Sequence, residues 1–426
     1  MTNKTNIKKG IQLAGIVMLM LISLMGCSKD KTDSTTTDST TTNNLPNITG
    51  YPIVGTNQTT FYNNTGEITA PAPEDPYYGQ NAFHQGNVPS YTDNGDGTIT
   101  DNVTGLMWVK ARGSKITWSD AVTDASTNRT GGYSDWRMPT IKELYSLIRF
   151  SGVNGSDNTS TAGYIPFIDT TYFGFTYGPG TSTNIGERII DCQDWSANKY
   201  VSTVMDGQSA IFGVNFADGR IKGYNQFVGT SSTENELYAR YVRGNTSYGI
   251  NSFVDNDDNT ITDLATNLMW SKDDSKTGLD WPAALAWVQT QNAANYLGHN
   301  DWRLPDAKEM QSIIDYTRSP STTNSPAIDV NFFNTTSITN EAGQADYPYF
   351  WTSSVLIDGG PFPSGIYISF GRAMGYWNNA WVDVHGAGSQ KSDIMVGNPA
   401  DYPTGRGPQG DAVRIYNYVR LVRDAK

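Results

Sequence analysis

The side chains best suited to bind a ligand lie close together near the C-terminus of this 426-residue chain. Aromatic rings can pack on the C–H faces of sugars, while planar amides and carboxylates can hydrogen-bond sugar hydroxyl groups. Glycine-rich segments flank the stretch, and His385 follows it. In the alternative interpretation, its two tryptophans are inward-facing strand residues. The candidate ligand-binding residues are Tyr376, Trp377, Asn378, Asn379, Trp381 and Asp383.

Two acidic turns contain the residue types that could bind calcium, a cation that takes carboxylate and carbonyl oxygens. Neither turn completes an EF-hand loop, because no glutamate occupies the twelfth position. Aspartate, asparagine and glycine are also the residues that tight turns require, so turn formation is the stronger interpretation. The candidate calcium ligands are Asp93, Asp96 and Asp101 in one turn and Asp255, Asp257 and Asp263 in the other.

Residues that would support catalysis are scarce. The chain has only two cysteines, Cys27 and Cys192, its three histidines are scattered, and no Cys/His spacing suggests zinc. No Ser-His-Asp ordering can be read from the sequence either. The formal charge of -12 argues against nucleic acid as a partner, because phosphate binding draws mainly on Lys and Arg. We therefore expect a non-enzymatic protein that binds no nucleic acid, and calcium is the one cofactor that the sequence suggests.

A ten-residue motif that occurs twice identifies the elements that must position these groups. Residues 135–144 read Asp-Trp-Arg-Met-Pro-Thr-Ile-Lys-Glu-Leu, and residues 301–310 read Asp-Trp-Arg-Leu-Pro-Asp-Ala-Lys-Glu-Met. The proline disfavours helix in the residues before it, and Thr140 or Asp306 lies three residues before a glutamate, as in a capping box. Each copy therefore predicts an extended segment that runs into a helix. We expect the tryptophans to anchor cores and the arginines to lie in ion networks. The expected structural residues are Trp108, Asp135, Trp136, Arg137, Glu143, Trp270, Asp301, Trp302, Arg303 and Glu309.

The two motifs belong to two longer repeats. Each repeat begins with an acidic turn and Thr-Ile-Thr-Asp, continues through Leu-Met-Trp, and has a first helix that opens at Thr117 or Asp280. Each ends in a segment that alternates apolar residues with arginine, which predicts a strand with one buried face. The sequence therefore predicts two tandem domains, residues 91–243 and 253–423. We expect the arginines of the final strands to face carboxylates or solvent; these are Arg240, Arg243, Arg420 and Arg423.

The N-terminal residues predict export and anchoring. Residues 1–27 combine three lysines, an apolar run and Leu24-Met25-Gly26-Cys27, which resembles a lipobox. Lipid on Cys27 would hold the chain on a membrane, whereas a plain transmembrane anchor is the weaker alternative because the apolar run is short. Residues 28–45 are rich in Ser and Thr and predict a disordered tether. Residues 46–90 form a lead-in with no clear pattern.

Taken in order, the landmarks of each repeat resemble the C-terminal domain family of the Legionella collagen-like adhesin. They are the turn with Thr-Ile-Thr-Asp, Leu-Met-Trp, Asp-Trp-Arg-x-Pro-x-x-x-Glu, Trp-Ser/Thr and a final Val-Arg-x-Val-Arg, in which Ala239 replaces the first valine of the first repeat. The resemblance implies an α+β protein with two tandem C-type-lectin-like domains. Each would have a twisted, mainly antiparallel sheet, two helices and long loops.

The resemblance also implies a bacterial surface protein that binds or adheres to glycans, and it supplies no catalytic residues. With the predicted lipid on Cys27, we expect a non-catalytic binding protein anchored in a bacterial membrane, at the outer membrane or the cell surface. Its partners would be the membrane and a surface glycan, polymer or protein. Two alternatives remain: an architectural envelope component, or a catalyst related to formylglycine-generating oxidases. The second needs a cysteine pair that Cys192 alone does not provide.

Overall fold

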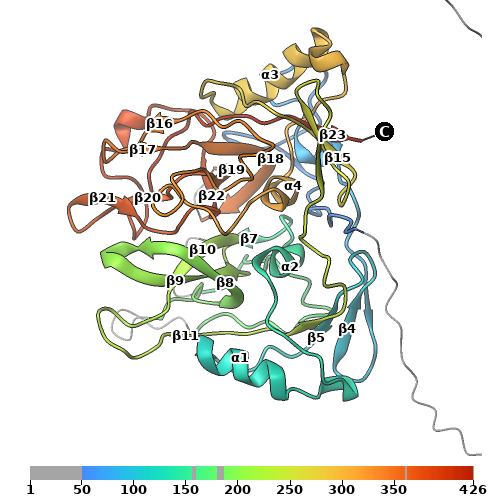
Figure 1. Cartoon of the computed structure of the whole chain (residues 1–426), viewed down its shortest axis with the longest axis vertical. Coiled ribbons are helices and arrows are strands. Elements are labelled where there is room, and N and C mark those ends of the chain that lie inside the picture. Colours follow the sequence, from blue (N-terminus) through green and yellow to red (C-terminus); the bar gives the residue numbers. More distant parts are fainter. Residues whose placement is uncertain (1–49, 156–159, 180–186, 360–361, 426) are drawn as a thin grey trace, which may run out of the picture. The chain divides into compact units, whose positions relative to one another are not determined.

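A computed structural model describes residues 50–155, 160–179, 187–359 and 362–425 (Figure 1). The predicted leader, Cys27 and the tether lie outside these residues. The described chain is a mixed α+β structure made mostly of sheet. No helix in the described ranges has the length and apolar character needed to cross a bilayer. The α-helices of the described chain are α1 (Trp118–Thr127), α2 (Ile141–Ser146), α3 (Trp281–Ala293) and α4 (Ala307–Ser312).

Both repeats fold into the same series of elements. Each begins with a meander whose outer strand pairs with the last strand of the repeat, so the ends of each repeat meet in one four-stranded sheet. In the first repeat these strands are β3 (Tyr91–Asp93), β4 (Thr98–Asp101), β5 (Met107–Val109) and β12 (Val242–Arg243). In the second they are β13 (Phe253–Asp255), β14 (Thr260–Asp263), β15 (Leu268–Ser271) and β23 (Val422–Asp424).

The helix starts confirm the predicted capping chemistry. Thr117 accepts a hydrogen bond from the backbone N–H of Asp120, and Asp280 accepts one from that of Ala283. At α2 and α4, the cap side chain and the glutamate three residues later bond each other's backbone in complete capping boxes. These bonds satisfy N–H groups that a helix start leaves without partners.

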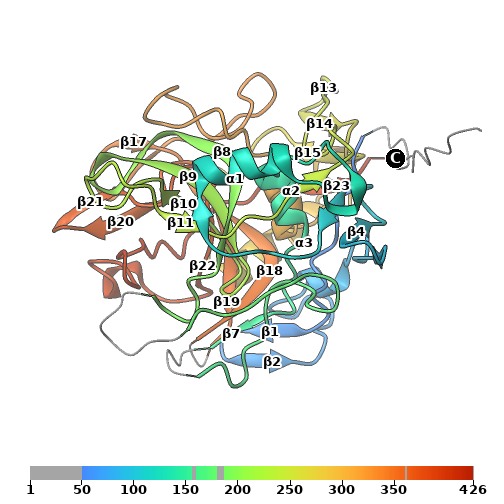
Figure 2. The same cartoon turned by 90° about the horizontal axis from the view of Figure 1, so that it is seen from below.

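The repeats share a seven-stranded sheet. Its order is β7-β18-β19-β22-β10-β9-β8. Strands β8, β9 and β10 of the first repeat are equivalent to β18, β19 and β22 of the second. The two sets meet where β10 pairs with β22 in antiparallel orientation. The repeats are therefore related by an approximate two-fold axis between β10 and β22 (Figures 1 and 2). The strands are β7 (Val153–Asn154), β8 (Gln193–Val204), β9 (Gln208–Asn215), β10 (Arg220–Asn225), β18 (Tyr349–Asp358), β19 (Ser364–Ser369) and β22 (Gln390–Ile394).

Four short pairs complete the strands of the described chain. Their members are β1 (Phe61–Asn63) with β2 (Gly66–Ile68), β6 (Ile116–Thr117) with β11 (Glu236–Leu237), β16 (Ile338–Thr339) with β17 (Ala345–Asp346), and β20 (Met374–Trp377) with β21 (Ala380–Asp383). Residues 208–225 form the hairpin of β9 and β10. The final strands are shorter than the predicted segments 238–243 and 418–423.

A pair of equivalent lysines crosses between the repeats near the two-fold axis. Lys142 on α2 donates to the carbonyl oxygen of Ser312 at the end of α4, at 2.6 Å, and Lys308 on α4 donates to that of Ser146 at the end of α2, at 2.8 Å. Each ammonium group therefore caps the helix of the other repeat, where the carbonyl groups lack partners. The reciprocal bonds hold α2 and α4 together.

The core is divided in the same symmetric way. A central cluster contains residues of both repeats, among them Ile148, Phe212, Ile314 and Phe350. Two outer clusters are equivalent to one another, one beneath α1 around Trp136 and the other beneath α3 around the corresponding tryptophan. Because the largest cluster is shared, the repeats form one body rather than two independent domains.

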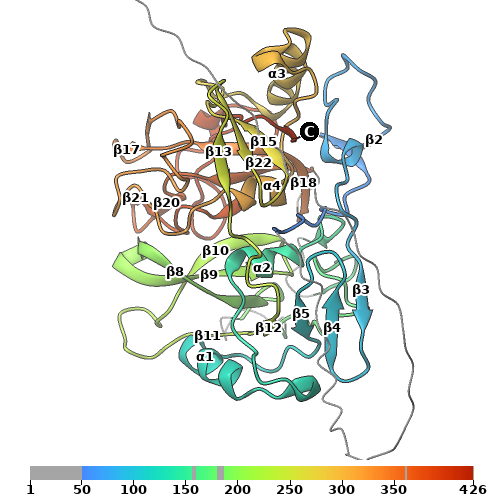
Figure 3. The same ribbon diagram turned by 45° about the vertical axis from the view of Figure 1, so that its right-hand side comes forward.

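The lead-in packs on the second repeat before the chain enters the first (Figure 3). Gln58, only 3% exposed, bonds both the N–H and the carbonyl of Val355 and also the carbonyl of Phe150. Tyr77 lies over Trp281 of α3 with ring centroids 6.0 Å apart. This segment, which has no clear sequence pattern, is therefore an integral part of the second repeat.

The prediction for two of the final-strand arginines was wrong. Arg240 and Arg420 are fully buried, and within the described structure neither forms an ion pair with a carboxylate. Arg240 donates to the carbonyl oxygen of Gly174 at 2.8 Å, and Arg420 donates to those of Ser271 and Asn334 at 2.9 and 2.7 Å. Burial lowers the pKa of both guanidinium groups to about 10. The loop carbonyls that hold them lie far away in the sequence, so the strand pattern alone could not reveal them.

Candidate functional site

A polar cavity of about 530 Å³ opens where the strands of the two repeats meet. Its walls come from β10 and the preceding turn in the first repeat, from β22 and the loop 402–413 in the second, and from the turn between β1 and β2. The site therefore exists only because both repeats and the lead-in fold together. The charged and aromatic residues of its walls are Arg188, Asp218, Arg220, Lys222, Asp358, Phe362, Lys391, Asp393, Tyr402, Arg406 and Asp411.

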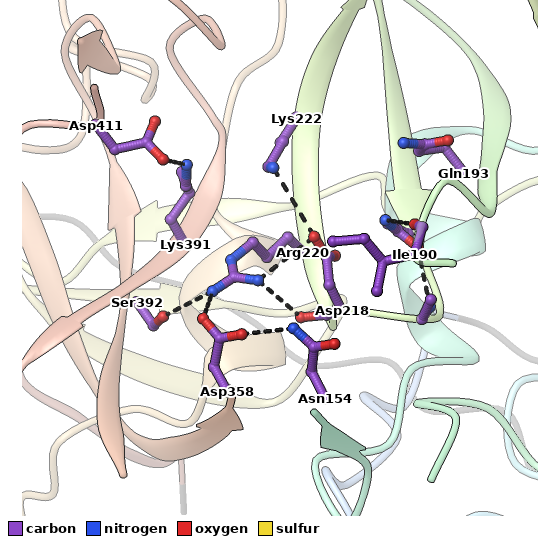
Figure 4. Close-up of polar contacts among 12 residues, drawn as sticks. Asn154, Ile190, Gln193, Asp218, Arg220, Lys222, Asp358, Lys391, Ser392 and Asp411 are labelled. Carbon is purple, nitrogen blue, oxygen red and sulfur yellow. Dashed lines mark hydrogen bonds and ion pairs between the residues drawn. The ribbon is translucent and has the colours of Figure 1, made fainter. Parts of the chain in front are cut away.

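Arg220 joins the two repeats at the floor of this cavity (Figure 4). Its guanidinium contacts the Asp358 carboxylate, donates to Ser392 at 3.3 Å, and pairs with Asp218 of its own repeat at 3.4 Å. Asn154 donates to the second oxygen of Asp358 at 2.5 Å. Burial opposes both charges, yet the pKa of Asp358 is held below its usual value by Arg220. The pKa of Arg220 is raised by Asp358 and Asp218 against the same burial.

A second cluster lies beside it. Lys391 contacts the Asp411 carboxylate and the His385 ring nitrogen Nε2, which is 2.8 Å from the other Asp411 oxygen. Burial, then the charge of Lys391, lowers the pKa of His385 to about 3, so this histidine is neutral. Burial also lowers the pKa of Lys391 to about 7. No serine or cysteine side chain is hydrogen-bonded to the ring in the described structure, so the cluster is not a nucleophile-activating triad.

Several lining groups are left with hydrogen-bonding capacity. Asp218 Oδ1 and Asn154 Oδ1 have no hydrogen-bond donor among the described residues. Within the part of the chain that the structure describes, Lys222 has only a long ion pair with Asp218, at 3.8 Å, and Arg406 is exposed. Phe362, which is 56% exposed, adds an apolar face to the same cavity. Mixed donors, acceptors and an aromatic face suit a polyhydroxylated ligand better than a polyanion, because the acids and bases of the walls nearly balance.

The structure uses much of the predicted aromatic site for contact between the repeats. Trp377 and Asn378, at the tip of the β20–β21 hairpin, donate to Asp206 in the turn between β8 and β9, at 2.9 and 3.1 Å. Asp383 is half-buried and accepts from Tyr200 at 2.7 Å, and desolvation of its carboxyl group raises its pKa to about 6. The remaining members lie on the hairpin itself: Tyr376 and Trp381 pack against each other, and Asn379 is exposed in the turn.

This hairpin nevertheless supports the polar cavity. The backbone N–H of Tyr376 donates to the carbonyl of Gly410 at 2.8 Å, and Gly375 forms a bridge with Asp411. The hairpin therefore fixes the loop that forms one wall. The predicted residues lie behind this wall rather than in the cavity.

The acidic turns use their carboxylates in local bonds. Asp93 and Asp255 accept backbone N–H groups two residues on and pair with Lys110 and Lys272, respectively. Asp96 accepts from the backbone N–H of Thr98 at 3.0 Å.

The buried aspartates at the ends of these strands behave in the same way. Asp101 accepts the N–H groups of Val103 and Thr104, and Asp263 accepts those of Ser252 and Ala265. Asp257 contributes its backbone N–H rather than its carboxylate. Across the described ranges, no three acidic, histidine or cysteine side chains come close enough to hold a metal ion. Turn formation accounts for the contacts of these residues.

The residues of the repeated motif lie in the cores and in ion pairs. Trp136 and Trp302 are 4% and 2% exposed. Arg137 holds Glu143 through two bonds of 2.7 and 2.5 Å, and Arg303 holds Glu309 in the same bidentate way. The first aspartate of each motif pairs with the last arginine of its repeat at 2.6 Å: Asp135 with Arg243, and Asp301 with Arg423. The tryptophans of the two Leu-Met-Trp segments, Trp108 and Trp270, are fully buried.

Sequence reasoning missed the residues of the polar cavity. Arg220 and Lys222 alternate with Ile221 and Gly223 along β10, whereas Lys391 and Asp393 lie in β22, whose sequence Gln-Lys-Ser-Asp-Ile is mostly polar. Both patterns resemble solvent-exposed strands. Only the pairing of β10 with β22 turns these faces into one site. The turn residues between 215 and 220 indicate the hairpin of β9 and β10. No local pattern indicates that β22 is the other partner of β10.

Cys192 is buried, and its thiol donates to the carbonyl of Ile189 at 3.2 Å. Burial raises the pKa of this thiol to about 11. A thiol held protonated in this way is a poor nucleophile or metal ligand.

Comparison with known families identifies these repeats. The model of the Lcl C-terminal domain matches residues 97–243 and 259–384, which together make up more than half of the chain. The protein therefore belongs to the Lcl C-terminal domain family and contains two copies of the domain. In the structure the second copy continues to β23, beyond the end of the match. No curated protein and no solved structure gave a match.

Proposed function

We propose that this protein is a lipid-anchored, non-catalytic binding protein of the bacterial cell envelope, whose paired C-type-lectin-like repeats bind a surface glycan or similar polar polymer. The observation that carries the proposal is the cavity between β10 and β22, which has nearly balanced charges and oxygens without donors. Membership of the Lcl C-terminal domain family supports it, because the resemblance of the repeats to the adhesin domain implies binding to glycans.

The anchor is a separate part of the proposal. The lipobox-like Leu24-Met25-Gly26-Cys27 supports acylation of Cys27, which would place the protein at the outer membrane or cell surface. Mass spectrometry of the purified protein should find acyl groups on an N-terminal Cys27, and Cys27→Ser should release the protein from the membrane fraction. Membrane retention of Cys27→Ser would reject the lipid anchor. Protease treatment of intact cells then distinguishes surface exposure from an inward orientation.

Ligand binding is tested with a glycan array, run with calcium and with chelator. We expect binding that is lost when Lys222 and Arg406 are both changed to alanine, because these cavity cations are the least constrained by partners. The matched variant is Trp377→Ala with Trp381→Ala, which disturbs the hairpin predicted from sequence. Loss only in the hairpin variant would assign the site to the hairpin. The absence of any binding by the folded protein would favour an architectural role.

A further inference from the structure

The two repeats carry equivalent surfaces beside α2 and α4, and the lead-in covers one of them. On the second repeat, Thr56 accepts the backbone N–H of Phe150 at 2.8 Å, and Lys308 donates to the carbonyl of Gly55 at 3.2 Å. Gln58 then pairs with both backbone groups of Val355. Residues 54–58 thus lie in a groove between α4 and the loop after α2, with Asn57 in the left-handed backbone region at φ 60°.

The equivalent groove of the first repeat is open. It is a cavity of about 720 Å³ between α2 and the loop after α4. Its walls correspond position by position to those that hold the lead-in: Ile141 corresponds to Ala307, Asn198 to Ser354 and Tyr316 to Phe150. Asn198 and Ser354 perform the same task, since each accepts the backbone N–H of the first residue of the motif helix, at 2.8 and 3.1 Å.

The linker between the repeats fills only the start of this groove. Gly249 accepts from Lys142 at 3.1 Å, which matches the bond between Gly55 and Lys308. The linker then leaves for β13, whereas the lead-in continues along its groove for three more residues. Ile250, which is 64% exposed, lies at the edge of the cavity.

The open groove has a backbone N–H group at the position equivalent to the one that bonds the lead-in. The N–H of Phe150 is bonded to Thr56, but the corresponding N–H of Tyr316 has no partner among the described residues. Ile141, Ile313 and Ile314 supply an apolar wall. An extended peptide can satisfy such a backbone donor with its own carbonyl and place alternate side chains against the wall.

The charge of the groove restricts the peptide further. The Arg137 guanidinium is taken up by Glu143, and Asp315 pairs with Arg318 at 3.0 Å. The carboxylate of Asp329 accepts only from Asn331 of its own loop within the described structure. Lys142 also lines the cavity, but its ammonium group already donates to Gly249, Asn251 and Ser312. The Asp329 carboxylate therefore presents the less satisfied charge to a ligand, which disfavours an acidic peptide.

We propose that this open groove binds a neutral or basic peptide segment of another protein, in the manner in which the second repeat holds residues 54–58. A second copy of this chain is a poorer occupant, because its own Thr56 and Gln58 are 0% and 3% exposed and would have to leave their groove. The site is distinct from the polar cavity, so the inference goes beyond the glycan-binding proposal.

The test uses a fluorescent synthetic peptide with the sequence of residues 53–59, Ile-Val-Gly-Thr-Asn-Gln-Thr, titrated into the full-length protein in detergent and followed by anisotropy. We expect saturable binding that weakens about tenfold or more when the peptide glutamine is replaced by glutamate. Thr246→Trp places a large ring at the exposed cavity edge and should abolish binding. Ser247→Trp is the control, because Ser247 is exposed and does not line the cavity.

The absence of saturable peptide binding by the folded wild-type protein would overturn the proposal. Binding that survives Thr246→Trp would also overturn it, since the peptide would then lie elsewhere. Analytical ultracentrifugation of the same variants addresses the competing occupant. Self-association of the wild-type protein that Thr246→Trp abolishes and Ser247→Trp leaves intact would assign the groove to a second copy and reject a foreign peptide.

Discussion

The two repeats have the same elements, the same motif and the same buried tryptophans, yet they differ in what covers their helices. The second repeat holds the lead-in along α4, whereas the first leaves the equivalent surface beside α2 as a cavity. The cause is the path of the chain. The lead-in reaches its groove from the N-terminal side and can continue along it, while the linker has to enter β13 after the first contact.

The comparison shows how a duplicated domain can acquire two roles without a change of core. Residues that specify the fold lie at equivalent positions and have equivalent partners. The groups available to a ligand lie where the two repeats differ. These places are the junction of β10 with β22, which occurs once, and the open groove of the first repeat. Differences in surroundings, rather than in motif, therefore indicate the candidate sites.

Removing the equivalent core tryptophans, one at a time, tests whether the two repeats contribute equally to one cooperative structure. Trp136→Ala and Trp302→Ala should each lower the free energy of unfolding by about 3–5 kcal/mol, because each deletes a large buried ring. Since the central cluster contains both repeats, either variant should still unfold in one transition. Calorimetry and denaturant unfolding followed by circular dichroism measure both quantities. Tyr416→Ala is the control, because this ring is 51% exposed.

Two separate transitions in either tryptophan variant would contradict this expectation. The repeats would then be independent domains that happen to touch, and the shared cluster would contribute little to cooperativity.

A smaller change tests whether the lead-in belongs to the second repeat. Gln58→Ala should lower the free energy of unfolding by about 1–3 kcal/mol, because it leaves buried backbone groups of Val355 and Phe150 without partners. Limited proteolysis should then cut the segment 50–90 faster than in the wild-type protein. Gln85→Ala, at an exposed position of the same segment, should change neither measurement. Equal cleavage of all three proteins would show that the lead-in is not held by this residue.

Local chemistry made a large part of this arrangement predictable from sequence. Capping boxes depend on residues three positions apart, so Thr140 with Glu143 and Asp306 with Glu309 could be read directly. The buried motif tryptophans followed from the same local pattern. The duplication supported both inferences, because each copy provided an independent example.

The functional cavity depends on pairings that no local pattern encodes. Arg220 and Asp358 are 138 residues apart, and their contact follows only from the adjacency of β10 and β22. The same limit explains the misplaced aromatic site, because Asp206, which holds Trp377, is 171 residues away. It also explains Arg240 and Arg420, whose loop carbonyls are remote in the sequence.

The finest comparison concerns the crossing lysines and the pH dependence of stability. Burial lowers the pKa of Lys142 to about 8 and also lowers that of Lys308, which the lead-in covers more completely. Between about pH 8 and about pH 9.5 the unfolded chain keeps these protons while the folded chain releases them, so stability should rise with pH. Lys308→Met should reduce the slope by about 1 kcal/mol per pH unit, and Lys142→Met by less. Denaturant unfolding at the two pH values measures these slopes. Lys276→Met, at a half-exposed side chain, should leave the slope unchanged. If both buried lysine variants retained the wild-type slope, these amines would be protonated in the folded protein, and burial would not lower their pKa.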